Sequence, residues 1–78
     1  MNNGRESALD LRGLKCPLPV LKTRRHLRDL ATGTLIRVET TDPLAVIDIP
    51  HYCREDGHQL LESAPVEGGG HVFVIEKG

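Results

Sequence analysis

A short strand pattern followed at once by two closely spaced prolines limits how the first third of this chain can fold. Residues 8–12 alternate between apolar and polar side chains, which is typical of a β-strand with one buried face. Pro17 and Pro19 follow, and proline is tolerated in the first turn of a helix, where its missing N–H would have no intrahelical partner. The sequence therefore predicts a strand that leads directly into a helix over residues 17–31, with Cys16 at the junction.

Cys16 is predicted to be a reactive thiol at the N-cap of this helix or next to it. The N–H groups of a first helical turn and the positive end of the helix dipole stabilise a thiolate placed there. Because the two prolines carry no N–H, the amide of Leu18 is the expected donor to the sulfur. Lys15 and Arg12 add positive charge nearby, so we expect the pKa of Cys16 to be depressed. The plainer alternative is a cysteine that packs as a small apolar side chain.

The length and the low aromatic content of the chain exclude several classes of function. Its 78 residues suffice for one small domain, predicted over residues 8–78 after a flexible segment 1–7. Tyr52 and Phe73 are the only aromatic residues, too few for the stacking surfaces that bind single-stranded nucleic acid. No nucleophile–base pattern indicates hydrolytic chemistry, and the four histidines lack zinc-site spacing. We therefore expect no metal and no cofactor.

Charge is distributed unevenly along the chain. Residues 1–30 carry seven basic and three acidic side chains, whereas residues 31–78 carry three basic and eight acidic ones. Lys22 and Arg25 share one face of the predicted helix and extend the positive charge away from Cys16. This pattern favours an acidic partner near the sulfur. The alternative, which the sequence supports equally well, is that the basic helix face only contacts solvent.

The rest of the sequence predicts three more strands and a second helix. The strands, of which the last two flank a glycine-rich hairpin turn, are expected over residues 34–41, 58–64 and 71–77. Because Pro50 would interrupt a helix that began at residue 43, the pattern favours a turn over residues 43–47 and a helix from Asp48 to Asp56. The order β-α-β-α-β-β predicts an α/β (α+β) two-layer sandwich, in which two helices cover one face of a four-stranded mixed sheet.

Cys16 and Cys53 are the only cysteines, too few for a disulfide framework. No signal-peptide core and no apolar run of membrane-spanning length is evident in the sequence. We expect a monomer in the reducing cytoplasm, away from the membrane, where Cys16 stays free. Cys53 lies among apolar residues of the second helix and is predicted to be buried, and a resolving thiol that pairs with Cys16 is the alternative.

Three segments of the chain together resemble a known family. They are Leu9–Pro19 with its Cys-Pro-x-Pro motif, Thr41-Asp42-Pro43, and Asp48-Ile49-Pro50 followed by Cys53 and Gly57-His58. On these segments the chain resembles the TusA-like (SirA-like) sulfur carrier proteins over residues 8–77. The resemblance implies a two-layer sandwich similar to the C-terminal domain of bacterial translation initiation factor 3. It also implies that Cys16 carries sulfane sulfur as a persulfide.

The resemblance further implies the kinds of partner that such a carrier meets. A cysteine desulfurase or a rhodanese-like protein loads the sulfur, and an acceptor protein removes it, so the chain would act as a sulfurtransferase in the loose sense of a relay. The sulfur of the best-known member ends in a tRNA wobble uridine, which makes tRNA at most an indirect partner. Other members serve sulfur oxidation, molybdenum cofactor assembly or selenium handling. Leu18 stands where the tRNA-thiolating members carry Glu, which weakens that assignment.

Two further classes of function remain open at the level of sequence. One is a noncatalytic regulatory adaptor in which Cys16 is incidental. The other is a thiol redox sensor that pairs Cys16 with Cys53.

Overall fold

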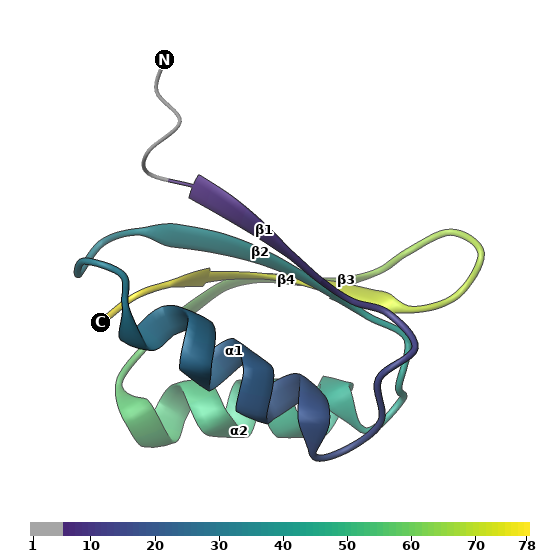
Figure 1. Cartoon of the computed structure of the whole chain (residues 1–78). Helices are drawn as coiled ribbons and strands as arrows, with labels where there is room; N and C mark the ends of the chain where they lie inside the picture. The colour runs from purple at the N-terminus through teal and green to yellow at the C-terminus, as the bar shows by residue number, and fades with distance from the viewer. Residues whose placement is uncertain (1–5) are drawn as a thin grey trace.

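In the computed structural model, which describes residues 6–78, a four-stranded mixed sheet packs against two helices that cover one of its faces (Figure 1). The elements, in chain order, are β1 (Glu6–Leu11), α1 (Leu18–Arg28), β2 (Leu35–Thr40), α2 (Ala45–Asp56), β3 (Gln59–Pro65) and β4 (His71–Glu76). The predicted order of elements and the two-layer architecture are confirmed. The segment predicted to be flexible, residues 1–7, overlaps the start of β1, and its first five residues lie outside the described part of the chain.

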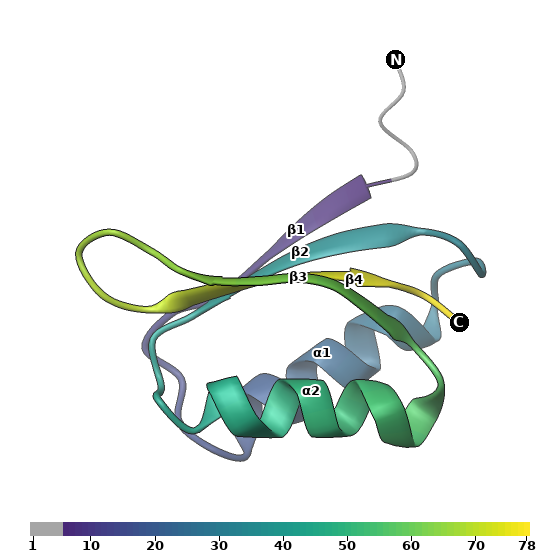
Figure 2. The same ribbon diagram turned by 180° about the vertical axis from the view of Figure 1, so that it is seen from behind.

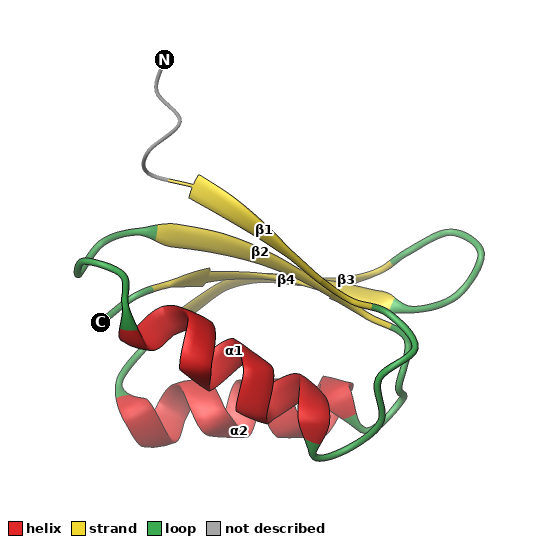
Figure 3. Ribbon diagram, in the orientation of Figure 1, coloured by secondary structure: helices red, strands yellow, loops and turns green. Residues whose placement is uncertain are grey.

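The sheet has the strand order β1-β2-β4-β3. β1 and β2 are parallel and are joined by α1, whereas β4 runs antiparallel to both of its neighbours. Seen from behind, α2 lies under the β3 side of the sheet and α1 under the β1 side (Figure 2). Both helices begin at the end of the molecule where β1 and β2 finish (Figure 3). Two loops, residues 12–17 and 41–44, therefore meet at that end.

The hydrophobic core lies between the sheet and the helices and is mostly aliphatic. Burial alternates along β2, and Phe73 and Ile75 of β4 are fully buried, so that one face of the sheet is apolar and faces the helices. The largest fully buried side chains are Phe73, Leu27, Ile36, Ile49, Ile75 and Val38. They come from both helices and the two central strands. The core therefore holds both helices, and so also their N-terminal ends, in a fixed position against the sheet.

The helix α2 begins earlier than the sequence predicted. It starts at Ala45 and contains Pro50, so the predicted turn over residues 43–47 and the helix start at Asp48 are wrong. Proline in a helix interior costs about 3 kcal/mol, through one lost hydrogen bond and a steric clash. Each large apolar side chain that is fully buried contributes roughly 1.5–3 kcal/mol. The buried face of α2 continues on both sides of the proline and outweighs that cost, through Ala45, Ile49, Tyr52 and Cys53.

The helix α1 ends at Arg28, earlier than the predicted residue 31. Lys77, which follows β4, donates hydrogen bonds to carbonyl groups at the end of α1 and just beyond it. The Nζ atom of Lys77 donates hydrogen bonds to the carbonyl oxygens of Leu27, at 2.6 Å, and of Leu30, at 3.0 Å. A positive charge at a helix C-terminus also interacts favourably with the helix dipole. Lys77 therefore stabilises the end of α1 in a way that no local sequence signal indicates.

Lys77→Met should lower the free energy of unfolding by about 2 kcal/mol, because hydrogen bonds from a charged donor to one carbonyl of α1 and to another just beyond its end are lost. Urea denaturation followed by circular dichroism measures this loss. Lys22→Met is the matched control, since Lys22 is an exposed lysine on α1 itself. Equal losses in the two variants would contradict the capping role of Lys77.

Candidate functional site

Cys16 is exposed in the loop that joins β1 to α1. The N-cap of α1 is Pro17, so the cysteine precedes the cap instead of occupying it. The N–H of Leu18 donates to the carbonyl oxygen of Lys15 at 2.8 Å and closes a turn around the cysteine. Cys16 thus lies next to the N-cap, within the predicted placement, whereas the predicted hydrogen bond from Leu18 to its sulfur is wrong. Pro19, by contrast, is buried and anchors the start of the helix to the core.

The loop 41–44 holds the cysteine loop in place. The hydroxyl oxygen of Thr41 accepts a hydrogen bond from the N–H of Gly13 at 2.8 Å. One carboxylate oxygen of Asp42 accepts from the N–H of Cys16 at 2.6 Å, and the other accepts from the N–H of Leu44 at 3.2 Å. A single carboxylate thus ties the backbone of Cys16 to the start of α2, which fixes the cysteine relative to both helices.

Asp48 in α2 contacts the sulfur directly. The thiol of Cys16 donates a hydrogen bond to Oδ2 of Asp48 across 3.0 Å. This hydrogen bond, together with partial removal of water and the negative charges of Asp48 and Asp42, raises the pKa of Cys16 above its ordinary value. The prediction of a depressed pKa is therefore wrong for this state of the protein, because a carboxylate next to a thiol disfavours the thiolate.

The basic residues expected to stabilise the thiolate are engaged differently. The guanidinium of Arg12 pairs with the carboxylate of Asp10, with nitrogen–oxygen distances of 2.8 and 2.9 Å. This pairing lowers the pKa of Asp10 to about 2, and the charge of Arg12 is compensated there. Lys15 is exposed beside the cysteine in the same loop. Carboxylates therefore have a larger effect on the pKa of the Cys16 thiol than the nearby basic residues have.

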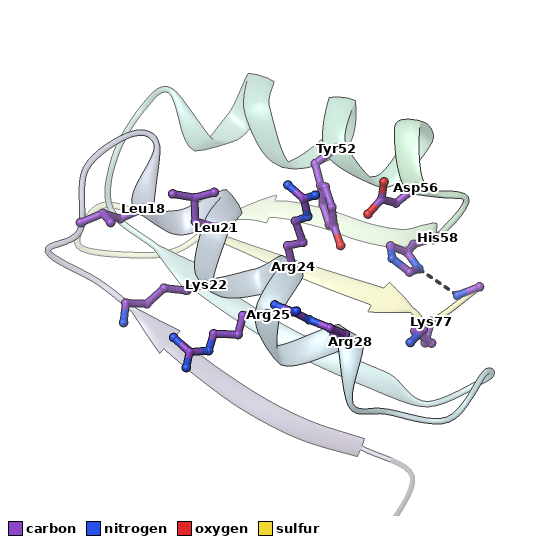
Figure 4. A pocket seen from close by; sticks show the side chains of 11 residues that line it. Leu18, Leu21, Lys22, Arg24, Arg25, Arg28, Tyr52, Asp56, His58 and Lys77 are labelled. Atoms are coloured by element: carbon purple, nitrogen blue, oxygen red, sulfur yellow. Dashed lines mark hydrogen bonds between the residues drawn. The ribbon is translucent and has the colours of Figure 1, made fainter.

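A basic groove of about 700 Å³ runs between α1 and α2 (Figure 4). Its basic lining residues are Lys22, Arg24, Arg25, Arg28 and Lys77, and the acidic Asp56 also lines it. Leu18, two residues after Cys16, lines the groove as well, so the groove lies beside the cysteine loop. The predicted pair Lys22 and Arg25 is exposed and forms part of this larger basic surface.

Sequence reasoning missed three of these basic residues. Arg24 lies three residues after Leu21, and Arg28 lies four residues after Arg24. These spacings place all three side chains on one side of the helix. That periodicity could have indicated a basic face turned toward a second helix. Lys77 lies in the last residues of the chain, and only the tertiary fold brings it to the groove.

Cys53 is enclosed in the core, as its apolar context predicted, whereas Cys16 faces solvent. Both cysteines are free thiols. Burial raises the pKa of the Cys53 thiol to about 11. A buried thiol with a raised pKa is a poor nucleophile, so the exposed Cys16 is the better candidate for chemistry with a partner.

The free energy of unfolding should fall as the pH rises from 9 to 11. In this range Cys53 loses its proton in the unfolded chain, with the ordinary pKa of 9.0, but keeps it in the folded protein. The unfolded state then binds fewer protons, so each rise in pH favours it. Cys53→Ala should make the decline shallower, although Cys16 and Tyr52, whose pKa values are also raised, still contribute. Urea denaturation at several pH values measures the slope, and an equally steep decline in both proteins would contradict this account.

Within residues 6–78, no group of three or more His, Cys, Asp and Glu side chains is placed to hold a metal ion. In the same part of the chain, no helix has the length and apolar character needed to span a bilayer.

Comparisons with known proteins identify the family. The family model described as "Sulfurtransferase TusA" matches residues 7–77. The sulfur carrier protein TusA of Pseudomonas putida (strain W619) is 42% identical over 72 residues, which cover 92% of this chain and 89% of that protein. The sulfur carrier protein TusA of Pseudomonas aeruginosa (strain LESB58) is 40% identical over 77 residues, covering 99% and 96%.

A solved structure shows the same fold. The crystal structure of a SirA-like protein from Desulfitobacterium hafniense superimposes with a TM-score of 0.83, at 22% identity, over 92% of this chain and 97% of that one. The fold, the Cys-Pro-x-Pro loop and the extent of these matches agree, and the chain belongs to the TusA family of sulfur carrier proteins.

Proposed function

We propose that this protein accepts sulfane sulfur as a persulfide on Cys16 and passes it to an acceptor protein. The observation that carries the proposal is the position of Cys16, an exposed thiol in a loop held at the end where both helices begin. A sulfur relay needs a thiol that can enter the active sites of two different proteins. Such a thiol must lie on the surface, at a fixed place, and next to a surface that partners can bind.

The transfer reaction is balanced without any external oxidant. Sγ of Cys16 attacks the outer sulfur of a donor persulfide and forms a new S–S bond, while the S–S bond within the donor breaks. The electron pair of the broken bond leaves with the donor thiolate, which takes up the proton released by Cys16. The donor persulfide is thereby reduced to a thiol, and the Cys16 thiol becomes a persulfide. Unloading repeats the same exchange with the thiol of an acceptor.

The residues around Cys16 support this exchange in different ways. Pro17 and the buried Pro19 limit the movement of the loop. Leu18 is exposed and offers an apolar contact to a partner. Lys15 and Arg12 are exposed on the same loop and add a polar rim to the docking surface.

The partners of such a relay are a sulfur donor and a sulfur acceptor in the cytoplasm. A cysteine desulfurase or a rhodanese-like protein is the donor, and tRNA is reached only through further proteins. Lys22 and Arg25 lie on α1 within two helical turns of Leu18, or about 10 Å at 1.5 Å per residue. A protein that covers Cys16 will therefore also cover this basic pair.

Loading in vitro tests the proposal. The purified protein is incubated with a cysteine desulfurase and cysteine, and separately with a rhodanese and thiosulfate. We expect the intact mass to rise by one sulfur atom, with the addition mapped to the Cys16 peptide and removed by dithiothreitol. No added sulfur with either donor, or sulfur on Cys53 alone, would refute a carrier function for Cys16.

A further inference from the structure

The contact between Cys16 and Asp48 depends on the loading state of the cysteine. It exists because the thiol carries a proton, which it donates to Oδ2 of Asp48 across 3.0 Å. In a persulfide the inner sulfur is bonded to Cβ and to the outer sulfur and has no proton to donate. Any remaining proton lies on the outer sulfur, one S–S bond of about 2.0 Å further out. Loading therefore removes the hydrogen bond to Asp48.

The groups around the sulfur make the loaded form unfavourable at this position. Asp48 faces the sulfur from α2, and Asp42 lies on the loop that precedes that helix. Of the basic residues in the cysteine loop, Arg12 is paired with Asp10, and Lys15 is exposed. The inner sulfur has no proton, so its lone pairs repel those of the Asp48 carboxylate oxygen. An outer sulfur that is anionic is repelled by the negative charges of both Asp48 and Asp42.

We propose that Asp48 is a positioning residue that holds the empty thiol of Cys16 against α2 and releases the persulfide away from α2, toward a partner. This inference rests on the proposed function, because it assigns a role to Asp48 in the loading and unloading of Cys16. Its consequence is a bias in the exchange reaction. Asp48 stabilises the empty carrier and disfavours the loaded one, so it promotes delivery of sulfur at the expense of its uptake.

The alternative is a purely structural role, in which Asp48 only helps to hold the loop to α2. The two roles differ in what Asp48→Asn changes. The amide oxygen can still accept a hydrogen bond from the thiol, so the loop contact is retained. The amide has no charge, so the penalty on a persulfide anion is lost. A structural role predicts little change in sulfur chemistry, whereas a positioning role predicts a shift in both measurements described below.

The first measurement is the exchange equilibrium with glutathione persulfide and glutathione. The loaded fraction of the protein is read by intact mass spectrometry at fixed concentrations of both reagents. Asp48→Asn should raise the ratio of loaded to empty protein by at least about threefold, the size expected when one negative charge is removed from beside an exposed anion. The matched control is Glu55→Gln, which removes one negative charge from the same helix about 10 Å further along at 1.5 Å per residue.

The second measurement is the rate of alkylation of Cys16 by iodoacetamide as a function of pH, in a Cys53→Ala background. Asp48→Asn should move the midpoint of the profile to lower pH. Each unit of this shift raises the rate at pH 7 about threefold, since a tenfold gain in thiolate is partly offset by lower nucleophilicity. Above the midpoint the variant should react more slowly than the parent. Asp48→Glu, which keeps the carboxylate, should return the profile toward that of the parent.

The outcomes separate this proposal from the proposed function. If the parent protein takes up no sulfur on Cys16 from glutathione persulfide or from the donor enzymes, the carrier function fails, and the alkylation profiles still decide whether Asp48 controls the thiol. If the parent loads, but Asp48→Asn and Glu55→Gln give the same loaded fraction and the same alkylation midpoint, Asp48 has no positioning role and the carrier function stands. Circular dichroism of each variant confirms that the comparison is made between folded proteins.

Discussion

Cys16→Ser should abolish sulfur uptake completely. The serine hydroxyl is similar in size and can replace the thiol at an exposed position, but oxygen cannot form the S–S bond on which the exchange depends. The fold should survive, because Cys16 contributes nothing to the buried core. Uptake is measured as the sulfide released by dithiothreitol after incubation with a donor enzyme and removal of small molecules. Sulfur release from the Cys16→Ser protein equal to that of the parent would show that the carrier site lies elsewhere.

Cys53→Ala is the matched control for this prediction. Cys53 is buried in the core and is the only other thiol in the chain, so its replacement should preserve loading. The variant should lose about 1 kcal/mol of stability, a usual size for a truncation in a core. If a folded Cys53→Ala protein failed to load or to deliver sulfur, Cys53 would act as a second reactive thiol, and the redox alternative would gain support.

The fold could be predicted from the sequence because its signals are local. Alternating apolar residues, two prolines before an amphipathic stretch and a run of glycines gave the order and type of all six elements. The errors arose where tertiary contacts override local preference. Burial on both sides of Pro50 lets α2 start at Ala45, and the side chain of Lys77 caps α1 across 50 residues of sequence. Neither effect has a local signature.

The site was only half predictable for the same reason. The sequence identified Cys16 and its prolines, because helix-start chemistry is a matter of neighbouring residues. It gave the wrong direction for the pKa of Cys16, because the carboxylates that act on the sulfur come from Asp42 and Asp48, 26 and 32 residues away. Both aspartates stand in segments that carry the family resemblance. The sequence assigned neither of them a role at the sulfur, and only the fold showed that they meet the cysteine.

Reversing two charges on α1 should slow the loading of Cys16 by about tenfold at low ionic strength, the lower end of what electrostatic steering provides. The variant combines Lys22→Glu with Arg25→Glu. Both side chains are exposed beside the groove that leads from the cysteine loop, so a donor with an acidic surface around its active site would approach the parent faster. Such charges affect the rate of association more than the stability of the final complex. The thiol should keep its alkylation profile.

A matched control separates local steering from net charge. Arg37→Glu with Arg54→Glu makes the same change in net charge at two exposed positions outside the groove, on β2 and near the end of α2. Loading rates are measured for both variants at low and high salt. We expect a rate loss in the α1 variant that shrinks as salt rises, because screening removes the steering that the parent enjoys. If both variants load as fast as the parent at low salt with each candidate donor, the basic face of α1 is merely solvated. If both lose the same rate, net charge matters and the groove does not.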